Sequence, residues 1–182
     1  MIVTPTAIPD VLLVQPAVHG DQRGFFAETW HDARNAAAGI RGPFVQDNHS
    51  RSVRHTLRGL HYQVRQPQGK LVRVVIGEIF DVAVDLRRSS PTFGRWVGVV
   101  LSDDNWRQLW VPPGFAHGFY VTSESADVIY KCTDYYAPEH ERTLRWDDAE
   151  VGIAWPIPEG RPPLLSPKDA AGLALRKAPS YP

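Results

Sequence analysis

Hydrophobic and polar residues alternate along much of the chain between Leu71 and Thr133, which predicts a succession of short β-strands. Segments rich in Pro, Gly, Ser and Asp separate these runs and have the composition of tight turns. One strand about every ten residues is the spacing of a β-sandwich or barrel. The expected strands cover 71–86, with a break at Gly77-Glu78, and then 96–101, 107–111, 116–121 and 127–133.

The alternation is clearest in the strand that ends at Leu86. Its even positions are the apolar Phe80, Val82, Val84 and Leu86, whereas the odd positions include two carboxylates, Asp81 and Asp85. Successive side chains of a strand point to opposite faces. We therefore expect the apolar face to form the core and the other face to carry the carboxylates.

Helical periodicity is scarce, and proline is concentrated at the C-terminal end. A short helix is predicted over 31–38, beside the barrel, and Gly39 is a typical helix stop. Seven of the sixteen prolines lie in the last 27 residues, which excludes a central strand there and leaves a helix only at 168–177. No internal repeat or change of composition marks a second domain. We expect 1–182 to form a single domain, with 155–182 as a tail packed over the barrel.

Charge and cysteine content exclude several classes of protein. Lys plus Arg and Asp plus Glu both number 20, so the net charge of zero argues against a broad nucleic-acid or acidic-membrane surface. Cys132 is the single cysteine, which excludes an internal disulfide and a thiolate metal cluster. The N-terminal residues lack the pattern of an export signal, and no apolar run approaches the ~18 residues of a membrane span. The sequence therefore predicts a cytoplasmic protein that binds neither nucleic acid nor membrane.

Two histidines lie in segments that resemble the half-motifs of the cupin barrel, one over 57–63 around His61 and one over 112–118 around His117. A metal-binding cupin has two histidines separated by one residue and then a carboxylate in its first motif. Here Gln63 occupies the second histidine position, and no carboxylate follows before Lys70. This pattern disfavours an iron or manganese cupin oxygenase. Taken singly, each histidine could equally be an ordinary core residue.

Eight segments, in order along the chain, resemble the dTDP-4-dehydrorhamnose 3,5-epimerase family: DQRGFF, FVQDNHS, LRGLH, GKLV, FDVAVD, SPTFG, GFAHGF and LSPKD. Members of this family are metal-free cupins that convert dTDP-4-dehydro-6-deoxy-D-glucose to dTDP-4-dehydro-L-rhamnose. The resemblance implies a mainly β, cupin-type jelly-roll barrel with short peripheral helices. It also implies an isomerase of dTDP-rhamnose and lipopolysaccharide O-antigen biosynthesis, with no cofactor or metal, working as a homodimer with exchanged N-terminal strands.

Inverting a carbon next to a ketone requires a base, stabilisation of the enolate oxygen, and an acid on the opposite face. The resemblance assigns the base to His61, its orienting carboxylate to Asp169, the 4-keto oxygen contact to Lys70 and the proton donor to Tyr130. Alternation places Tyr130 on one strand face with Val128 and Cys132, expected to be the barrel interior.

Each of these residue types also has an ordinary structural explanation. Asp169 could cap a C-terminal turn, and Lys70 could be a solvated lysine of an edge strand. Tyr135 and Tyr136 compete with Tyr130 for the role of acid, but they lie at the end of the strand, where packing at the barrel rim is the simpler explanation.

The resemblance implies a larger set of substrate contacts: Arg23, Phe26, Glu28, Gln46, Asp47, Asn48, Arg58, Lys70, His117, Glu141 and Lys168. A generic loop would account equally well for the polar residues 46–48, and a hairpin with core phenylalanines for the segment around Phe26. Strict alternation would direct Arg58 and His61 to opposite faces, so we expect a bulge or bend at Gly59.

Two other functions remain open at this stage. One is a monofunctional 3- or 5-epimerase of a related dTDP-4-keto-6-deoxysugar, which would keep the same catalytic residue types. The other is a non-catalytic cupin that binds a sugar nucleotide. The combination of a base, its carboxylate, a lysine and a tyrosine acid favours an enzyme.

Overall fold

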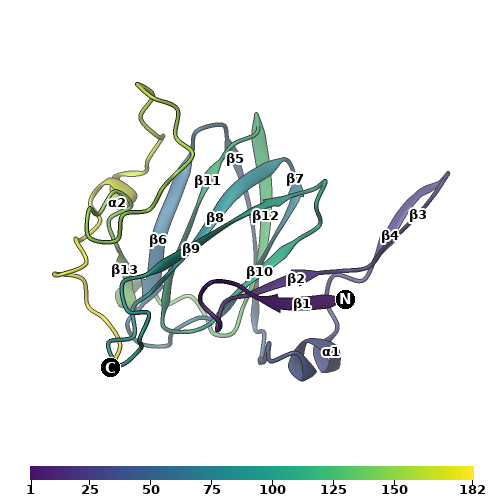
Figure 1. The fold of residues 1–182 in the computed structure, drawn as a ribbon, viewed down its shortest axis with the longest axis horizontal. Helices are drawn as coiled ribbons and strands as arrows, with labels where there is room; N and C mark the ends of the chain where they lie inside the picture. Colours follow the sequence, from purple (N-terminus) through teal and green to yellow (C-terminus); the bar gives the residue numbers. More distant parts are fainter.

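Two β-sheets packed face to face make up most of the computed structural model, which describes residues 1–182 (Figure 1). The larger sheet has the order β1 (Ile2–Pro5), β2 (Leu12–Gln15), β10 (Gln108–Val111), β7 (Lys70–Ile76), β12 (Ser125–Cys132), β5 (Gln46–Val53). The smaller sheet has the order β13 (Glu141–Thr143), β6 (Leu57–Gln63), β11 (Phe115–Val121), β8 (Glu78–Asp85), β9 (Trp96–Ser102). This arrangement, with short helices at the periphery, confirms the predicted jelly-roll class.

The strands predicted from alternation all form, whereas β5 was not predicted as a strand. Its sequence, QDNHSRSV, has no apolar stripe. One face of β5 lines a polar cavity and the other faces solvent, so neither face needs apolar residues. The predicted helix over 31–38 corresponds to α1 (Asp32–Ala37) with its two caps, and it stops before Gly39, whose φ is +91°.

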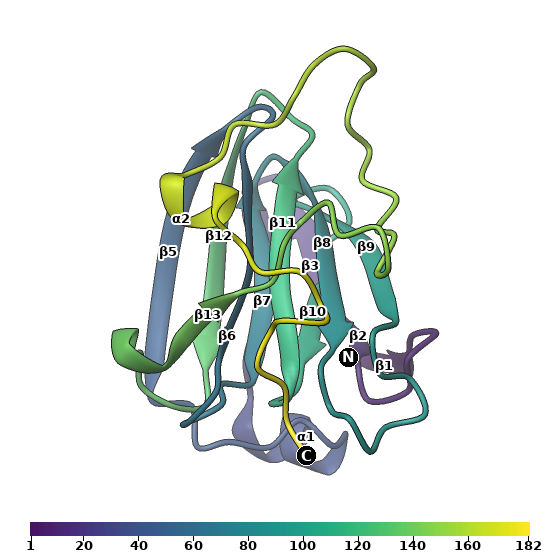
Figure 2. The same ribbon diagram turned by 90° about the vertical axis from the view of Figure 1, so that its left-hand side faces the viewer.

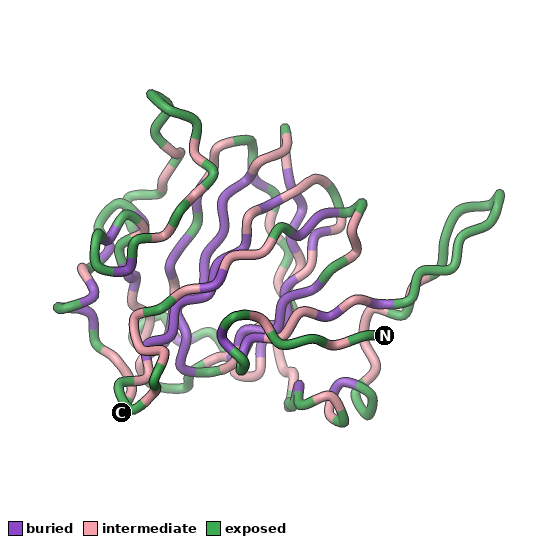
Figure 3. Tube along the Cα trace, viewed as in Figure 1, coloured by how far each residue is buried: buried purple, intermediate pink, exposed green.

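A two-stranded hairpin near the N-terminus extends away from the barrel (Figure 1). It consists of β3 (Val18–Asp21) and β4 (Gly24–Ala27) and is exposed along almost its whole length (Figure 3). Two large aromatic side chains lie on it, Phe25 at 66% exposure and Phe26 at 70%. Burial of aromatic rings drives much of folding and association, so this hairpin has the character of a surface that another element covers.

Both faces of β8 are buried, which corrects the expectation that its odd-numbered face would be polar and its even-numbered face the core. Ile79 and Ala83 pack in the hydrophobic core between the sheets, and Asp81 lies on the same face. Val82 and Val84 face outward, into a second apolar cluster formed with the C-terminal part of the chain. Alternation identifies two faces, but it cannot tell which of two buried faces is the interior.

The C-terminal part of the chain runs across the outer face of the five-stranded sheet (Figure 2). Three isolated parallel bridges attach it there: Thr56–Leu164, Leu144–Leu173 and Arg87–Tyr181. The expected helix at 168–177 is much shorter, α2 (Pro167–Ala170), because Gly172 passes within van der Waals contact of the Arg145 backbone and the chain then pairs as an extended segment. The tail therefore covers the apolar outer face of β8.

No helix of the structure is long and apolar enough to cross a membrane.

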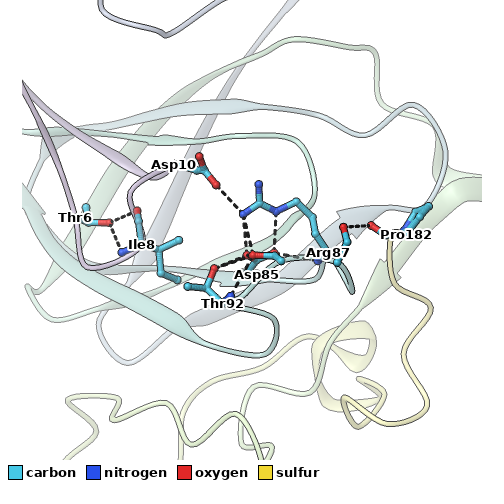
Figure 4. Close-up of polar contacts among 9 residues, drawn as sticks. Thr6, Ile8, Asp10, Asp85, Arg87, Thr92 and Pro182 are labelled. Carbon is cyan, nitrogen blue, oxygen red and sulfur yellow. Dashed lines mark hydrogen bonds and ion pairs between the residues drawn. The ribbon is translucent and has the colours of Figure 1, made fainter.

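A buried ionic network joins the end of β8 to the N-terminal segment (Figure 4). Asp85 is completely buried and accepts hydrogen bonds from Arg87 Nε at 2.9 Å, Ser90 Oγ at 2.6 Å and Thr92 Oγ1 at 2.7 Å. Arg87 also reaches the exposed Asp10, at 2.8 Å. Burial alone would raise the pKa of Asp85, but these hydrogen bonds outweigh burial and lower the pKa to about 2.

Replacing Asp85 by Asn is expected to destabilise the protein by roughly 3–5 kcal/mol, because it leaves Arg87 without its buried partner. A carboxylate with a depressed folded-state pKa stabilises the protein above its unfolded-state pKa of about 4, and this contribution is lost as the pH falls to about 2. Urea titrations of the wild type should show this decline in unfolding free energy, whereas Asp85→Asn should flatten it. Asp10→Asn is the matched control, with a cost below about 1 kcal/mol because the pair is exposed. Equal costs for the two variants would contradict the assignment.

Candidate active site

A cavity of about 340 Å³ opens between the two sheets. Its walls come from β5, β7 and β12 on one side and from β6 and β11 on the other. It is lined by Gln46, Asn48, Ser50, Arg58, His61, Gln68, Lys70, His117, Gly118, Phe119, Tyr130, Tyr136, Glu141 and Lys168. Most of these side chains are polar, so the cavity suits a ligand with many hydrogen-bonding groups and charge.

His61 and Asp169 form a hydrogen-bonded pair at this cavity. His61 Nε2 lies 2.6 Å from Asp169 Oδ1, and only a quarter of the His61 side chain is exposed. In the neutral tautomer that donates from Nε2, the other ring nitrogen, Nδ1, has a free lone pair. Burial lowers the pKa of His61, although the hydrogen bond to Asp169 opposes this shift. The neutral form, which can accept a proton, is therefore favoured near pH 7.

The tail delivers Asp169 to this position through α2. Ser166 caps the helix by accepting a hydrogen bond from Asp169 N at 3.1 Å, and its own hydroxyl donates to Asp169 Oδ2 at 2.7 Å. The Gly59 N–H donates to Asp169 Oδ1 at 3.3 Å. Burial raises the pKa of Asp169, but the hydrogen bonds from His61 and Ser166 outweigh it and the pKa is lowered. The carboxylate therefore stays ionised beside His61.

A bulge in β6 lets Arg58 and His61 line the same cavity, as the expected bend at Gly59 requires. Arg58 pairs with Phe119 and His61 pairs with His117, so two residues of β6 lie opposite one residue of β11. Gly59 has a φ of +124°, and a Cβ there would approach Gly118 Cα to 2.6 Å. Glycine is therefore required on steric grounds where the two strands come together.

Tyr130 and Lys70 line the opposite wall, on the six-stranded sheet. Tyr130 lies on the interior face of β12 with Val128 and Cys132, as the alternation predicted. Burial raises the pKa of the Tyr130 phenol, so it holds its proton at neutral pH. Burial lowers the pKa of Lys70, which begins β7 and points to the cavity. His61, whose neutral ring can accept a proton, and Tyr130, whose phenol can donate one, thus line the same cavity from different sheets.

His117 belongs to a second histidine–carboxylate pair. Its Nε2 lies 2.8 Å from Asp81 Oδ1, and both side chains are buried. Asp81 comes from β8, behind the cavity wall. The sequence placed Asp81 on a carboxylate face, yet it offered no sign that this carboxylate would hold His117.

Charged residues at the cavity mouth form a further network. Lys168 Nζ lies 2.9 Å from both carboxylate oxygens of Glu141, and Tyr136 Oη donates to Glu141 at 2.9 Å. Burial raises the pKa of Glu141, but hydrogen bonds from Lys168 and Tyr136 outweigh this effect and lower the pKa. These residues connect the tail to the rim of the barrel.

Four of the expected substrate contacts lie away from this cavity. Arg23 and Phe26 are on the projecting hairpin, and Glu28 follows it and is paired with Arg34. Asp47 points to the outer face of β5, where it accepts a hydrogen bond from Lys131 at 2.9 Å. Alternation along 46–48 could have separated Asp47 from its two neighbours, since successive strand residues face opposite sides.

Four cavity residues were not expected from the sequence, namely Ser50, Gln68, Gly118 and Phe119, whereas Tyr136 was expected at the barrel rim. For Ser50 a signal existed, because it continues the alternation of Gln46 and Asn48. No group of three or more His, Cys, Asp or Glu side chains is placed to hold a metal ion.

Comparison with known proteins identifies close relatives. A family model described as dTDP-4-dehydrorhamnose 3,5-epimerase matches residues 5–177. The dTDP-4-dehydrorhamnose 3,5-epimerase of Pseudomonas aeruginosa is 58% identical over 183 residues, covering 100% of both chains. The crystal structure of a Legionella pneumophila dTDP-6-deoxy-D-glucose-3,5-epimerase in complex with dTDP-4-keto-L-rhamnose is 53% identical, with a TM-score of 0.93 over 97% of this chain and 93% of that one. A 3'-monoepimerase of Streptomyces bikiniensis in complex with dTDP-quinovose is more distant, with 33% identity and a TM-score of 0.87 over 94% of this chain and 87% of its own.

Proposed function

The chain belongs to the dTDP-4-dehydrorhamnose 3,5-epimerase family, and on this premise we propose that His61 and Tyr130 carry out the two epimerisations. The enzyme is an isomerase that converts dTDP-4-dehydro-6-deoxy-D-glucose to dTDP-4-dehydro-L-rhamnose, in the biosynthesis of dTDP-rhamnose. Both carbons that change configuration, C3 and C5, flank the C4 ketone, so one type of proton transfer serves for both.

His61 acts as the base through Nδ1, which removes the proton from the carbon next to the ketone. The electron pair of the broken C–H bond moves into an enolate whose negative charge lies on the C4 oxygen. Asp169 holds the ring in the required tautomer and stabilises the imidazolium that forms, as in other His–Asp pairs. Lys70 donates a hydrogen bond to the enolate oxygen, where charge develops.

Tyr130 returns a proton to the opposite face of the same carbon. The raised pKa of its partly buried phenol keeps the proton in place until the enolate forms. His61 and Tyr130 lie on opposite sheets, so the proton arrives from the side opposite to the one it left. The configuration of the carbon is thereby inverted.

Arg58, His117, Gln46, Asn48, Glu141 and Lys168 bind the dTDP-sugar around this centre. Arg58 suits the diphosphate, because a guanidinium forms bidentate hydrogen bonds with phosphate oxygens. Its Nε is held by Ser52 Oγ at 2.9 Å, which fixes the direction of the side chain.

The observation that best supports this function is that the His61–Asp169 pair and the partly buried Tyr130 line the same cavity, which Lys70 also lines. The direct test is turnover of dTDP-4-dehydro-6-deoxy-D-glucose, coupled to a reductase that accepts only the L-sugar. Steady reductase activity that depends on the enzyme is the expected result. No turnover would exclude the double epimerase.

A monofunctional epimerase is the second candidate, because a 3'-monoepimerase has the same fold at 33% identity. The higher identity to the double epimerases favours action at both carbons. NMR of the reaction in heavy water distinguishes the two functions. Deuterium is expected at C3 and C5, whereas incorporation at one carbon alone would indicate the monofunctional enzyme.

We further infer that the enzyme is a homodimer in which the N-terminal hairpins are exchanged. The hairpin carries Arg23 and Phe26, and neither residue lies at the cavity of its own chain. Exchange would bring an arginine and an aromatic ring to the partner's cavity, where they suit the diphosphate and the thymine. A cytoplasmic location accords with the single, unpaired Cys132.

The exchange predicts that a variant with impaired binding and a variant with impaired catalysis complement each other at substrate concentrations below KM. Phe26→Ala should weaken dTDP binding roughly 10- to 100-fold through lost stacking on thymine, and His61→Asn should abolish catalysis. A co-expressed mixed dimer has one site with both defects and one with neither, so activity should reappear. The matched control is Phe25→Ala, since Phe25 packs on Trp106 of its own chain with ring centroids 4.5 Å apart. A monomer in analytical ultracentrifugation, or no complementation, would refute the exchange.

A further inference from the structure

Two buried side-chain atoms of this protein lack a hydrogen-bond partner, Ser50 Oγ and Asp81 Oδ2. Only Ser50 lines the active-site cavity, whereas Asp81 is buried behind its wall. Ser50 is in its wall, and Asp81 holds His117, which is also in the wall. Buried polar atoms are nearly always paired in native proteins, because an unpaired one loses its water without compensation. Because Ser50 lines the cavity, a bound ligand could supply the missing partner of its hydroxyl.

Ser50 is the one polar residue on the interior face of β5 whose side chain has no hydrogen-bond partner. Gln46, Asn48, Ser50 and Ser52 alternate along the interior face of β5. Gln46 Nε2 donates to Asn48 Oδ1 at 3.0 Å, and Asn48 Nδ2 donates to Cys132 Sγ at 3.5 Å. Ser52 Oγ accepts a hydrogen bond from Arg58. Every polar side chain of the row except Ser50 therefore has a partner within the protein.

The strand register places Ser50 between two groups with assigned roles. Asn48 of β5 pairs with the proton donor Tyr130 of β12. Ser50, two residues further along β5, pairs with Val128 of β12. The next residue on the same face, Ser52, holds the diphosphate-binding Arg58. With Tyr130 as the proton donor and Arg58 as the diphosphate ligand, as proposed above, Ser50 lies between the groups assigned to the reacting carbons and to the diphosphate.

In the substrate, the part that connects the reacting carbons to the diphosphate is the C1–C2 edge of the hexose. C1 carries the diphosphate, C3 reacts, and C2 between them carries a hydroxyl group. We propose that Ser50 is a substrate-binding residue whose Oγ hydrogen-bonds to this C2 hydroxyl. The proposal rests on the function given above, and it adds a specificity-determining contact for sugars that retain oxygen at C2.

The test combines Ser50→Ala with a substrate that lacks the C2 hydroxyl, dTDP-4-dehydro-2,6-dideoxy-D-glucose. Loss of one hydrogen bond should lower kcat/KM about threefold to tenfold, whether the serine or the sugar hydroxyl is removed. When both are removed, the loss should be no larger than either single loss, because the same contact is deleted twice. Multiplication of the two losses would refute the contact.

A second measurement does not depend on activity. Ser50→Ala removes an unpaired hydroxyl from the ligand-free protein, so its Tm should rise, by about 2–4 °C. Ser52→Ala is the matched control, since it lies on the same strand face but its hydroxyl is paired with Arg58. It should not raise Tm, and its loss of kcat/KM should multiply with that of the 2-deoxy substrate. A fall in Tm for Ser50→Ala would contradict the unpaired state of its hydroxyl.

The outcomes separate this proposal from the proposed function. Absence of wild-type turnover with the 2-hydroxy substrate would reject the epimerase itself. Normal wild-type turnover with independent effects of Ser50→Ala and the 2-deoxy sugar would reject only the Ser50 contact.

Discussion

Replacing His61 by Asn is expected to lower kcat by about 10³- to 10⁴-fold, the upper range of what a general base contributes. Asn can still accept a hydrogen bond, yet it cannot take up a proton near pH 7. The binding of dTDP should change little, because the diphosphate contact is assigned to Arg58. The coupled reductase assay measures kcat, and isothermal titration with dTDP measures the binding.

A matched variant tests whether the loss belongs to His61. His117→Asn removes the other histidine of the cavity, which also has a carboxylate partner, Asp81. Because His117 binds substrate in our proposal, its replacement should raise KM more than it lowers kcat. If His61→Asn retained a tenth of the wild-type kcat, or if His117→Asn proved the more damaging to kcat, the base would be misassigned.

The pH profile gives an independent signature of the same pair. The pKa of His61 is lowered by burial, so the acid limb of kcat/KM should lie below pH 6.5. Asp169 raises this pKa by its hydrogen bond, and its removal in Asp169→Asn should therefore move the limb to still lower pH while the rate falls. A limb that stayed in place would show that Asp169 does not contact the titrating base.

Replacing Tyr130 by Phe should give the second largest effect, a loss of inversion by about 10²- to 10⁴-fold. The base remains intact, so it should still remove a proton and return one to the same face. In heavy water, NMR should therefore show deuterium entering the substrate next to the ketone without formation of the L-sugar. Exchange and inversion, which are coupled in the wild type, become separate in this variant.

Tyr136→Phe is the control for this prediction, because Tyr136 also lines the cavity but hydrogen-bonds to Glu141 at the rim. It should retain inversion within about tenfold of the wild type. If Tyr136→Phe, rather than Tyr130→Phe, separated exchange from inversion, the rim tyrosine would be the acid.

Local patterns predicted most of the barrel because each strand between 70 and 132 has apolar residues on at least one face. They failed for β5, where a polar cavity wall and a solvent-exposed face leave no apolar stripe. They also assigned the wrong face of β8 to the interior of the barrel. The tail buries the outer face of this strand as deeply as the barrel buries the inner face. Such cases depend on contacts between distant segments, which no local window contains.

The residues of the site were predictable to different degrees. Alternation alone directs Tyr130 inward, and the need to direct Arg58 and His61 to one cavity predicts the bulge at Gly59. The contact between Asp169 and His61 came from family resemblance, because it joins positions 108 residues apart. Arg23 and Phe26 lie on a projecting hairpin, and in our proposal their role depends on a second chain. The unpaired state of Ser50 emerges only when all its neighbours are known.

The route of the tail has a consequence for the order in which the protein matures. Residues made first on the ribosome can fold first, so the strands of the barrel are complete before Asp169 is synthesised. A chain that stops short of Asp169 lacks the carboxylate that hydrogen-bonds to His61 and also leaves the apolar outer face of β8 uncovered. Exposed apolar surface of this kind promotes aggregation. In our proposal, catalytic competence and concealment of this apolar face are therefore acquired together, when the tail is complete.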